Sequence, residues 1–375
     1  MALSTKARAR SLSVLAAFIS LAMALLIAEF AVRTIAPQPI GNALPMYEPD
    51  SLCGHRLKTG FSGRLRSGEF NVRVRINSRG FRGDEWCFES LHRILILGDS
   101  FTFGYGVEED DTYSSVLERS LREENCGATV YNAGIPGYGT VQEYSLLTEL
   151  YDIIRPQLVI LAYTVGSDLR DTIEFLFSPE QGLEVRDGYL VKKSLPRGSR
   201  LGIKAYLQER SHLYVMLQRS KAILAMGGDD HLVPEPCDHF LARNPCGNSG
   251  AGWRETTRYL GQMAEYCSER GSIFMILAIP HPVQTDDDLW AGEIDRVEDA
   301  SDAWSREATQ DRLKDLASKI DCRFVDPLDR FRSWNDTSLY FTIDRHINRN
   351  GHELIAEELL QSIKAIIECN NYNDG

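Results

Sequence analysis

The 375-residue chain has little of what marks a nucleic-acid-binding or metal-binding protein. Its formal net charge is −12, and no basic stretch is interleaved with aromatic residues, so nucleic acid is not an expected partner. None of its cysteines shows Cys-x-x-Cys spacing, so a structural zinc site is not expected. The sequence contains no internal repeat. With 43% hydrophobic residues, the chain is long enough to bury the core of one large domain with additions.

The cysteine count is even, at eight, which is consistent with export to a compartment where thiols become paired. We predict two disulfides from the positions of the cysteines. Cys237 and Cys246 flank a polar loop, and Cys53 and Cys87 flank a segment that precedes the main domain. The alternative is that several cysteines are buried and unpaired, as small apolar residues.

Residues 11–28 form an uncharged, apolar segment that follows three basic residues, and residues 30–32 extend it beyond Glu29. A helix needs about 20 residues to cross the hydrocarbon core of a membrane, so this segment is close to that length. Because the positive charges precede it, they predict a cytoplasmic N-terminus and a main domain outside. We therefore expect residues 1–35 to be a cytoplasmic tail and a single-pass membrane anchor, with the main domain periplasmic or extracellular. A cleaved signal peptide is the alternative, because residues 22–24 fit a small-residue cleavage pattern.

Strand and helix patterns alternate through the rest of the chain. Segments with the composition of strands lie at residues 94–97, 129–132, 158–163, 272–279 and 323–325. Helical patterns lie at residues 113–123, 141–154, 254–270, 303–319 and about 351–367. Such alternation predicts an α/β fold, in which a five-stranded parallel sheet is covered by helices on both faces.

The first of these strands stops at Gly98-Asp99-Ser100, and a turn of small residues follows. This layout puts a serine hydroxyl at the carboxyl end of a parallel strand, where open α/β sheets bind their ligands. A helix that begins there directs the Ser100 N–H and its own positive end toward incoming negative charge. Ser100 is therefore a candidate nucleophile.

A candidate acid and base lie together on one loop before the last helix, as Asp344 and His346. A neutral imidazole would take the proton of Ser100, and the carboxylate would orient that imidazole and stabilise its charged form. His281 follows another strand and is the reserve candidate for the base. Two further loops, at residues 132–139 and 166–168, also follow strands.

These four loops, in this order, resemble the SGNH/GDSL hydrolase family over residues 91–368, with a similar lead-in at residues 77–82. The resemblance implies a three-layer α/β/α fold and ester hydrolysis at Ser100, His346 and Asp344, without cofactor or metal. Many members place the acid three residues before the histidine, whereas the spacing here is two.

The resemblance also implies an oxyanion hole with three donors. Two are the backbone N–H groups of Ser100 and Gly137, where the missing Cβ allows close approach to the substrate. The third is a side chain from a Gly-x-Asn-Asp or Gly-Asn-Asp block. Here that block reads Gly166-Ser167-Asp168, so Ser167 stands where the family has asparagine. The carboxylates Asp99 and Asp168 are expected to hydrogen-bond backbone N–H groups, the alternative being a metal site with Asp344.

Two segments do not follow the alternation. Residues 36–90 read as a linker and a pre-domain piece with a half-buried strand at residues 70–76, packed beside the main sheet. Residues 171–252, within a hydrolase domain at 91–370, read as an insertion after the third strand with a helix at 205–226. Such an insertion would emerge on the side of Ser100, as a lid or specificity element or as surface decoration.

Three functions remain open at this point. The first is an exported, membrane-anchored serine esterase that acts on acyl esters, such as O-acetyl groups of surface polysaccharide. The second is an O-acyltransferase that uses the same acyl-serine intermediate and a sugar hydroxyl as acceptor. The third is a degenerate fold that binds a glycan or a protein, an interpretation supported by Ser167.

Overall fold

The computed structural model describes residues 2–36, 38, 41–42, 44–90, 92–180, 182–193, 207, 210–226, 237–295, 300–335, 337–364 and 366. Contacts divide the chain into two compact units. One comprises Met1–Asn42 and Arg197–His231, and the other comprises Ala43–Pro196 and Leu232–Gly375. The middle of the expected insertion therefore groups with the N-terminal segment, and its two ends group with the larger unit.

The larger unit is built around a five-stranded parallel sheet with the strand order β12-β11-β8-β6-β7. Its strands are β6 (His92–Gly98), β7 (Ala128–Gly134), β8 (Leu158–Thr164), β11 (Ile273–Ile279) and β12 (Arg323–Val325). This arrangement confirms the predicted α/β fold class, with each strand within two residues of its expected limits. All of β8 is buried, because the sheet is covered on both faces.

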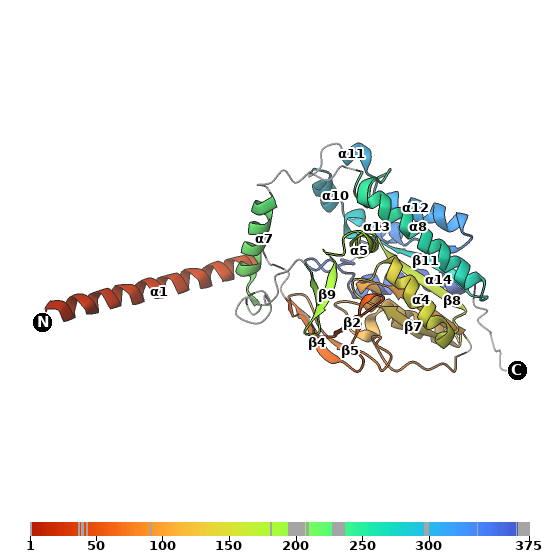
Figure 1. Ribbon diagram of the computed structural model, residues 1–375, viewed down its shortest axis with the longest axis horizontal. Helices are drawn as coiled ribbons and strands as arrows, with labels where there is room; N and C mark the ends of the chain where they lie inside the picture. Colours follow the sequence, from red (N-terminus) through yellow and green to blue (C-terminus); the bar gives the residue numbers. More distant parts are fainter. Residues whose placement is uncertain are drawn as a thin grey trace. The chain divides into compact units, whose positions relative to one another are not determined.

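Side chains of β6 alternate between two separate cores. Leu95 and Leu97 pack into the core that includes residues of α4, α8 and α12, whereas Ile94 and Ile96 pack with residues of α3 and α14. Figure 1 shows α4 and α8 side by side, as their contacts also indicate. The covering helices are α3 (Tyr113–Glu123), α4 (Thr140–Ile154), α8 (Gly247–Ser268), α12 (Ala308–Lys319) and α14 (Arg349–Lys364). The layers are thus helix, sheet and helix, as predicted.

The helix predicted at residues 303–319 is interrupted. A short helix α11 (Ala300–Ala303) ends before Trp304, and α12 begins only at Ala308. Trp304 instead forms a bridge with Ala242, and it is buried in a small apolar cluster. The contact of Trp304 with a residue far away in the sequence therefore determines its conformation, although the residues around it favour a helix.

Residues 44–90 fold as two antiparallel hairpins against the larger core. They are formed by β2 (Tyr47–Asp50) with β3 (Gly54–Leu57) and by β4 (Ser62–Ser67) with β5 (Asn71–Arg75). Leu65, Val72 and Val74 join the same core as Leu95 and Leu97. The pre-domain piece therefore packs against the main domain, as expected. The shorter elements of this unit are α2 (Ser100–Phe103), η1 (Glu109–Asp111), α5 (Ser167–Leu176), β9 (Leu183–Arg186), β10 (Tyr189–Lys192), α9 (Pro282–Thr285), α10 (Asp287–Ile294) and α13 (Leu328–Ser333).

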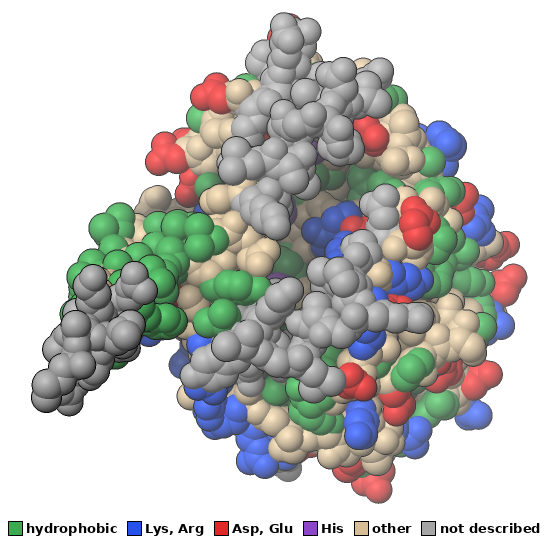
Figure 2. Space-filling view, turned by 60° about the vertical axis from the view of Figure 1, so that its left-hand side comes forward, with side chains coloured by type: hydrophobic (Ala, Val, Ile, Leu, Met, Phe, Trp, Pro, Cys, Tyr) green, Lys and Arg blue, Asp and Glu red, His purple; other side chains and the backbone are tan. Residues whose placement is uncertain are grey.

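The smaller unit contains α1 (Ala2–Ile35), the short strand β1 (Gly41–Asn42) and α7 (His212–Met226). Within α1, Leu12–Ile35 is long and apolar enough to cross a membrane, with a mean hydropathy of 2.4 and no buried part. Figure 2 shows hydrophobic side chains gathered on this helix. One of its apolar residues, Phe18, is 70% exposed. Contact between these apolar side chains and water is unfavourable, and the hydrocarbon core of a membrane would remove that contact.

Glu29 interrupts the apolar run of α1, and its carboxylate binds the first turn of α7. It accepts hydrogen bonds from the Ser211 hydroxyl (2.7 Å) and from the N–H groups of His212 (2.9 Å) and Leu213 (3.0 Å). These are groups that a helix N-terminus leaves without internal partners. Of the helix expected at 205–226, α7 covers His212–Met226, and Leu207 and Arg210 are also helical; residues 205, 206, 208 and 209 lie outside the described residues.

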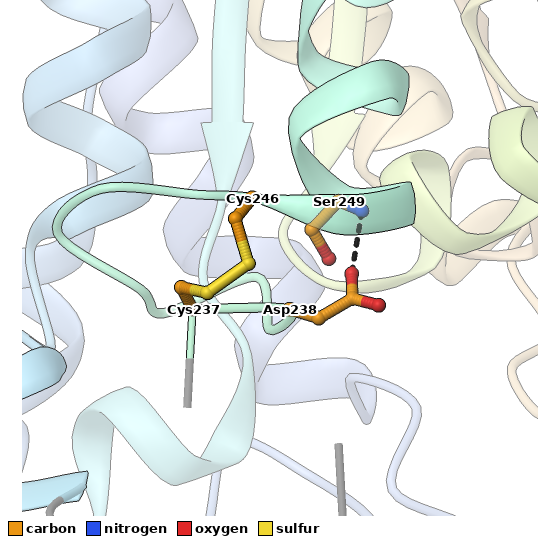
Figure 3. The surroundings of a disulfide bond; sticks show 4 residues. All are labelled: Cys237, Asp238, Cys246 and Ser249. Atoms are coloured by element: carbon orange, nitrogen blue, oxygen red, sulfur yellow. Dashed lines mark hydrogen bonds between the residues drawn. A yellow bond between two sulfur atoms is a disulfide. The ribbon is translucent and has the colours of Figure 1, made fainter. Parts of the chain in front are cut away.

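One of the two predicted disulfides is present. Cys237 and Cys246 are bonded, and the loop between them places Asp238 at the start of α8 (Figure 3). Cys53 and Cys87 are both free, so that predicted pair is wrong. Cys53 is buried against Gln142 of α4, whereas Cys87 is exposed near β7, because the segment between them folds as hairpins that do not bring its ends together.

Candidate active site

The turn after β6 holds Ser100 at the first position of α2. Asp99 is the N-cap residue, and its Oδ1 accepts a hydrogen bond from the Phe101 N–H at 2.8 Å. Gly98 is required at the end of the strand, because a Cβ there would lie 2.0 Å from Thr102 Oγ1. Gly104 ends the helix at φ +80°, a conformation that favours glycine. The sequence thus forces a sharp strand-to-helix turn that presents the Ser100 hydroxyl.

Asp99 is a structural carboxylate, as expected. It is 1% exposed, and it also accepts hydrogen bonds from the Thr164 hydroxyl (2.9 Å) and from the Ser167 hydroxyl (2.7 Å). These contacts join the end of β6 to the end of β8. Asp168 similarly accepts a hydrogen bond from the Thr164 N–H at 2.9 Å.

The bond to Asp99 differs from the role expected of Ser167. A hydroxyl has one proton to donate, and Ser167 gives it to a buried carboxylate. While this hydrogen bond is made, that proton is not available to an oxyanion. The cause is the short side chain, which reaches Asp99 across the turn.

Ser100, His346 and Asp344 lie in hydrogen-bonded order. His346 Nε2 is 2.8 Å from Ser100 Oγ, and His346 Nδ1 is 2.5 Å from Asp344 Oδ1. Because Nδ1 faces a carboxylate, it carries the ring proton and leaves Nε2 to accept the proton of Ser100. The imidazole packs between Phe101 and Tyr105, with ring centroids 4.8 and 4.7 Å away. Hydrogen bonds to both ring nitrogens and packing against two aromatic rings thus hold the imidazole in place.

Glu69, in the turn between β4 and β5, binds the loop that carries this acid and base. Its carboxylate accepts hydrogen bonds from the backbone N–H groups of Ile343 (3.1 Å) and Asp344 (2.8 Å). The neighbouring Phe70 packs against Phe341 with ring centroids 5.1 Å apart. The pre-domain hairpin therefore positions the catalytic loop candidate from outside the sheet.

Arg82 binds the other side of the site. Its guanidinium donates to the carbonyl oxygens of Phe103 (3.0 Å), Gly104 and Val107 (2.6 Å), which follow the nucleophile turn. The side chain is 4% exposed, and burial lowers the pKa of Arg82 to about 10, which still leaves it charged at neutral pH. In the sequence, residues 77–82 form a segment that resembles the SGNH/GDSL hydrolase family. The sequence did not predict the contacts of Arg82 or of Glu69 with the site.

A cavity of about 620 Å³ opens beside Ser100, Asp344 and His346. Its wall also includes residues from the end of β8, from the loop after β11 and from the loop closed by the Cys237–Cys246 disulfide. Figure 2 shows a hollow on one face in which basic and histidine side chains are visible. Gly137, at φ +82°, lines a separate cavity of about 120 Å³, where Leu183 of β9 lies over it. The structure thus brings the candidate nucleophile, base and acid together and places Gly137 beneath the β9–β10 hairpin.

The remaining candidate histidine, His281, lines the cavity without a hydrogen bond to Ser100 among the described residues. Its Nδ1 accepts from the Val283 N–H at 3.3 Å, so its proton is on Nε2. Burial lowers the pKa of His281 to about 4. This imidazole is a neutral hydrogen-bond donor at pH 7, and His346, not His281, contacts Ser100.

Residues 96–165, which contain the nucleophile turn, match the GDSL-like lipase/acylhydrolase family. An arylesterase from Vibrio mimicus is 30% identical over 82 residues, which are 22% of this chain and 41% of that relative. The match thus spans less than half the length of that curated relative. A lipase/acylhydrolase from Enterococcus faecalis is similar in structure, with 12% identity, a TM-score of 0.43 and coverage of 75% of this chain and 100% of that one.

A catalytic mutant of an acetylxylan esterase from Geobacillus stearothermophilus is also similar in structure. It shares 14% identity and a TM-score of 0.41, and the alignment covers 73% of this chain and 94% of that one. The family match includes the Gly98-Asp99-Ser100 turn that bears the candidate nucleophile. Over residues 96–165, the chain is thus similar to the GDSL-like lipase/acylhydrolase family.

Proposed function

We propose that this protein is a serine esterase that hydrolyses acyl esters, with Ser100 as nucleophile, His346 as general base and Asp344 as the acid that orients it. The observation that carries the proposal is the chain of hydrogen bonds from Ser100 through His346 to Asp344, at 2.8 and 2.5 Å. Its position at the carboxyl end of β6 supports it, because the cavity there admits a substrate.

In this mechanism, Ser100 Oγ attacks the ester carbonyl carbon while its proton passes to His346 Nε2. The tetrahedral intermediate collapses, the bond to the alcohol oxygen breaks, and the imidazolium protonates that oxygen. Water then enters, gives a proton to the same nitrogen and attacks the carbonyl carbon of the acyl-serine. The bond from that carbon to Ser100 Oγ breaks, the carboxylic acid leaves, and the imidazolium returns the proton to Ser100 Oγ. Asp344 stays ionised throughout and stabilises the charged imidazole.

The oxyanion hole in this proposal relies on backbone donors. The Ser100 N–H stands at the first position of α2. The Gly137 N–H is proposed as the second donor, from the loop after β7 that lines the neighbouring, smaller cavity. Ser167 contributes indirectly, since its hydroxyl fixes Asp99 and hence the nucleophile turn. Loss of one donor costs about 10²- to 10³-fold in rate, so a hole with two donors predicts slow turnover.

We also propose that α1 anchors the protein in a membrane, with the main domain periplasmic or extracellular. The apolar span Leu12–Ile35 supports this location, and so does the Cys237–Cys246 disulfide, since such bonds persist in oxidising compartments. Esters on surface glycans, including O-acetyl groups, would be accessible there.

Labelling with a fluorophosphonate probe tests the esterase proposal, using the full chain in detergent. We expect the probe to label Ser100 and to abolish hydrolysis of p-nitrophenyl acetate. Ser100→Ala should lose both, whereas Ser318→Ala, at an exposed position on α12, should keep both. A well-folded protein that shows neither labelling nor hydrolysis would contradict the proposal and favour a binding role.

A further inference from the structure

The cavity beside Ser100 is lined by two guanidinium groups and three carboxylates. Two arginines, Arg170 at the start of α5 and Arg345 between the candidate acid and base, line its wall. The N-terminus of the ten-residue helix α5 opens on the same cavity through Gly166 and Ser167. Guanidinium groups and helix N-termini both favour a bound anion.

Arg345 stands directly beside the reacting groups. Its backbone adopts φ +74°, which is uncommon for an arginine, and its N–H donates to the Phe341 carbonyl at 3.2 Å. Its side chain is exposed and makes no ion pair with a carboxylate of the described residues. The loop thus holds an uncompensated guanidinium next to His346.

Arg170 is only partly compensated. Its Nε donates to Asp171 Oδ1 at 3.1 Å, and 61% of its side chain is exposed. A guanidinium has five N–H donors in a planar fork, so one bond through Nε leaves the other four to bind a ligand.

The carboxylates on the cavity wall are engaged elsewhere. Glu174 binds Lys192 Nζ at 2.5 Å, and Asp344 binds His346. Asp238 accepts from the Ser249 N–H at 2.6 Å, at the N-terminus of α8 (Figure 3). These contacts hold each of the three carboxylates in a local interaction, and among the described residues none of the three is hydrogen-bonded to Arg170 or Arg345.

The pKa of His281 is also affected by these two arginines. After burial and the effect of His239, the charges of Arg170 and Arg345 contribute to the lowering of its pKa. It therefore stays neutral and offers its Nε2–H to the cavity. A wall with two guanidinium groups and a neutral donor is suited to a ligand with negative charge.

We infer that Arg345 and Arg170 bind a carboxylate that the substrate carries close to its acyl group. A guanidinium and a carboxylate form paired hydrogen bonds of matching geometry, and the two arginines here come from different elements, α5 and the loop before α14. The substrate class is thus an ester of an acidic molecule, such as an O-acylated acidic polysaccharide. This inference rests on the proposed esterase function and adds the charge of its substrate.

Two matched esters test the inference on the full chain in detergent: 4-acetoxybenzoate, which carries a carboxylate, and its neutral methyl ester. The measured quantity is the ratio of their kcat/KM values, each divided by the rate of hydrolysis by hydroxide. We expect this ratio to exceed about tenfold at low ionic strength and to fall as salt is added.

Substitution of either arginine should reduce that ratio. We expect Arg345→Asn, chosen because asparagine tolerates positive φ, to lower it about tenfold, mainly through KM for the anionic ester. Arg345→Lys should retain part of it, and Arg170→Gln should lower it as well. Arg349→Gln is the charge-matched control, since Arg349 lies outside the cavity and pairs with Glu353 and Asp111.

A ratio near one at low salt, or a ratio that both arginine variants leave unchanged, would overturn the inference. The proposed function fails differently, because then neither ester is hydrolysed and the fluorophosphonate probe does not label Ser100.

Discussion

Glu69 accepts a 2.8 Å hydrogen bond from the backbone N–H of Asp344. A carboxylate from a hairpin outside the central sheet therefore holds the residue that orients the candidate base. Arg82 supports the turn that carries Ser100, by donating hydrogen bonds to the carbonyl oxygens of Phe103 and Val107. The residues before the parallel sheet are thus part of the site's support.

The first prediction concerns this support. Glu69→Gln replaces a charged acceptor by a neutral one, and we expect kcat on p-nitrophenyl acetate to fall about tenfold with little change in KM. The rate of fluorophosphonate labelling at Ser100 should fall in parallel, because the base is less well positioned. Glu85→Gln is the control, since Glu85 binds Ser78 on the same segment. Equal kcat values for the wild type and Glu69→Gln would contradict the positioning role.

A second prediction concerns Ser167. Replacement by asparagine should supply the amide donor that the family's third block normally has, and kcat should rise, by up to tens of fold. Ser167→Ala removes the hydrogen bond to Asp99 and should lower the free energy of unfolding by about 1 kcal/mol. A folded Ser167→Asn variant with unchanged or lower kcat would show that the residue at this position does not reach the oxyanion.

The third prediction is a loss of stability in acid. Burial lowers the pKa of His352 to about 3, and its Nδ1 accepts from the Tyr113 N–H. The unfolded chain binds this proton near pH 6.5 and the folded protein does not, so stability falls as pH decreases from 6.5 toward 3. From this residue we expect a loss of about 2 kcal/mol between pH 7.5 and pH 5.

Chemical denaturation at these two pH values measures that loss. His352→Gln keeps an acceptor for Tyr113 but does not titrate, so the difference in unfolding free energy between pH 7.5 and pH 5 should shrink by about that amount. An unchanged difference in the variant would mean that other groups account for the acid sensitivity.

The fourth prediction concerns Glu29. Glu29→Gln should weaken the cap on α7, and we expect faster hydrogen exchange of amides near Leu213, with a loss of about 1 kcal/mol in local stability. Thr34→Ala serves as the control, because the Thr34 hydroxyl bonds only to carbonyls of its own helix. Exchange rates that match the wild type would show that α7 does not depend on this carboxylate.

The fifth prediction concerns topology. Cys87 is free and exposed, so a membrane-impermeant maleimide should label it in spheroplasts if the main domain lies outside. Cys87→Ser identifies the labelled site. Labelling of Cys87 only after the cells are lysed would reverse the proposed orientation.

The sheet could be predicted from sequence because its strands are buried on both faces and read as continuous apolar runs, as in β8. The candidate Ser100, Asp344 and His346 could be predicted because each lies in a loop next to a recognisable strand or helix. The order of those loops along the chain then placed them at one edge of the sheet.

Contacts between distant segments leave no local pattern, and these were not predicted. The bridge between Ala242 and Trp304 interrupts a helix that its own residues favour. The Ser167 hydroxyl donates its hydrogen bond to Asp99, which is 68 residues away in the sequence. Glu69 is likewise separated from Asp344 by 275 residues, and nothing in the residues around it distinguishes it from other surface acids.

That separation has a consequence for how the protein is made. Glu69 leaves the ribosome early, whereas its partner loop is among the last segments to be translated. At about 5–20 residues per second, roughly 14–55 s pass between them. Ser100 is likewise synthesised well before His346, which follows it by 246 residues. In the proposed mechanism, the nascent chain therefore lacks an assembled nucleophile, base and acid until translation is almost complete, and a truncated product would be inert.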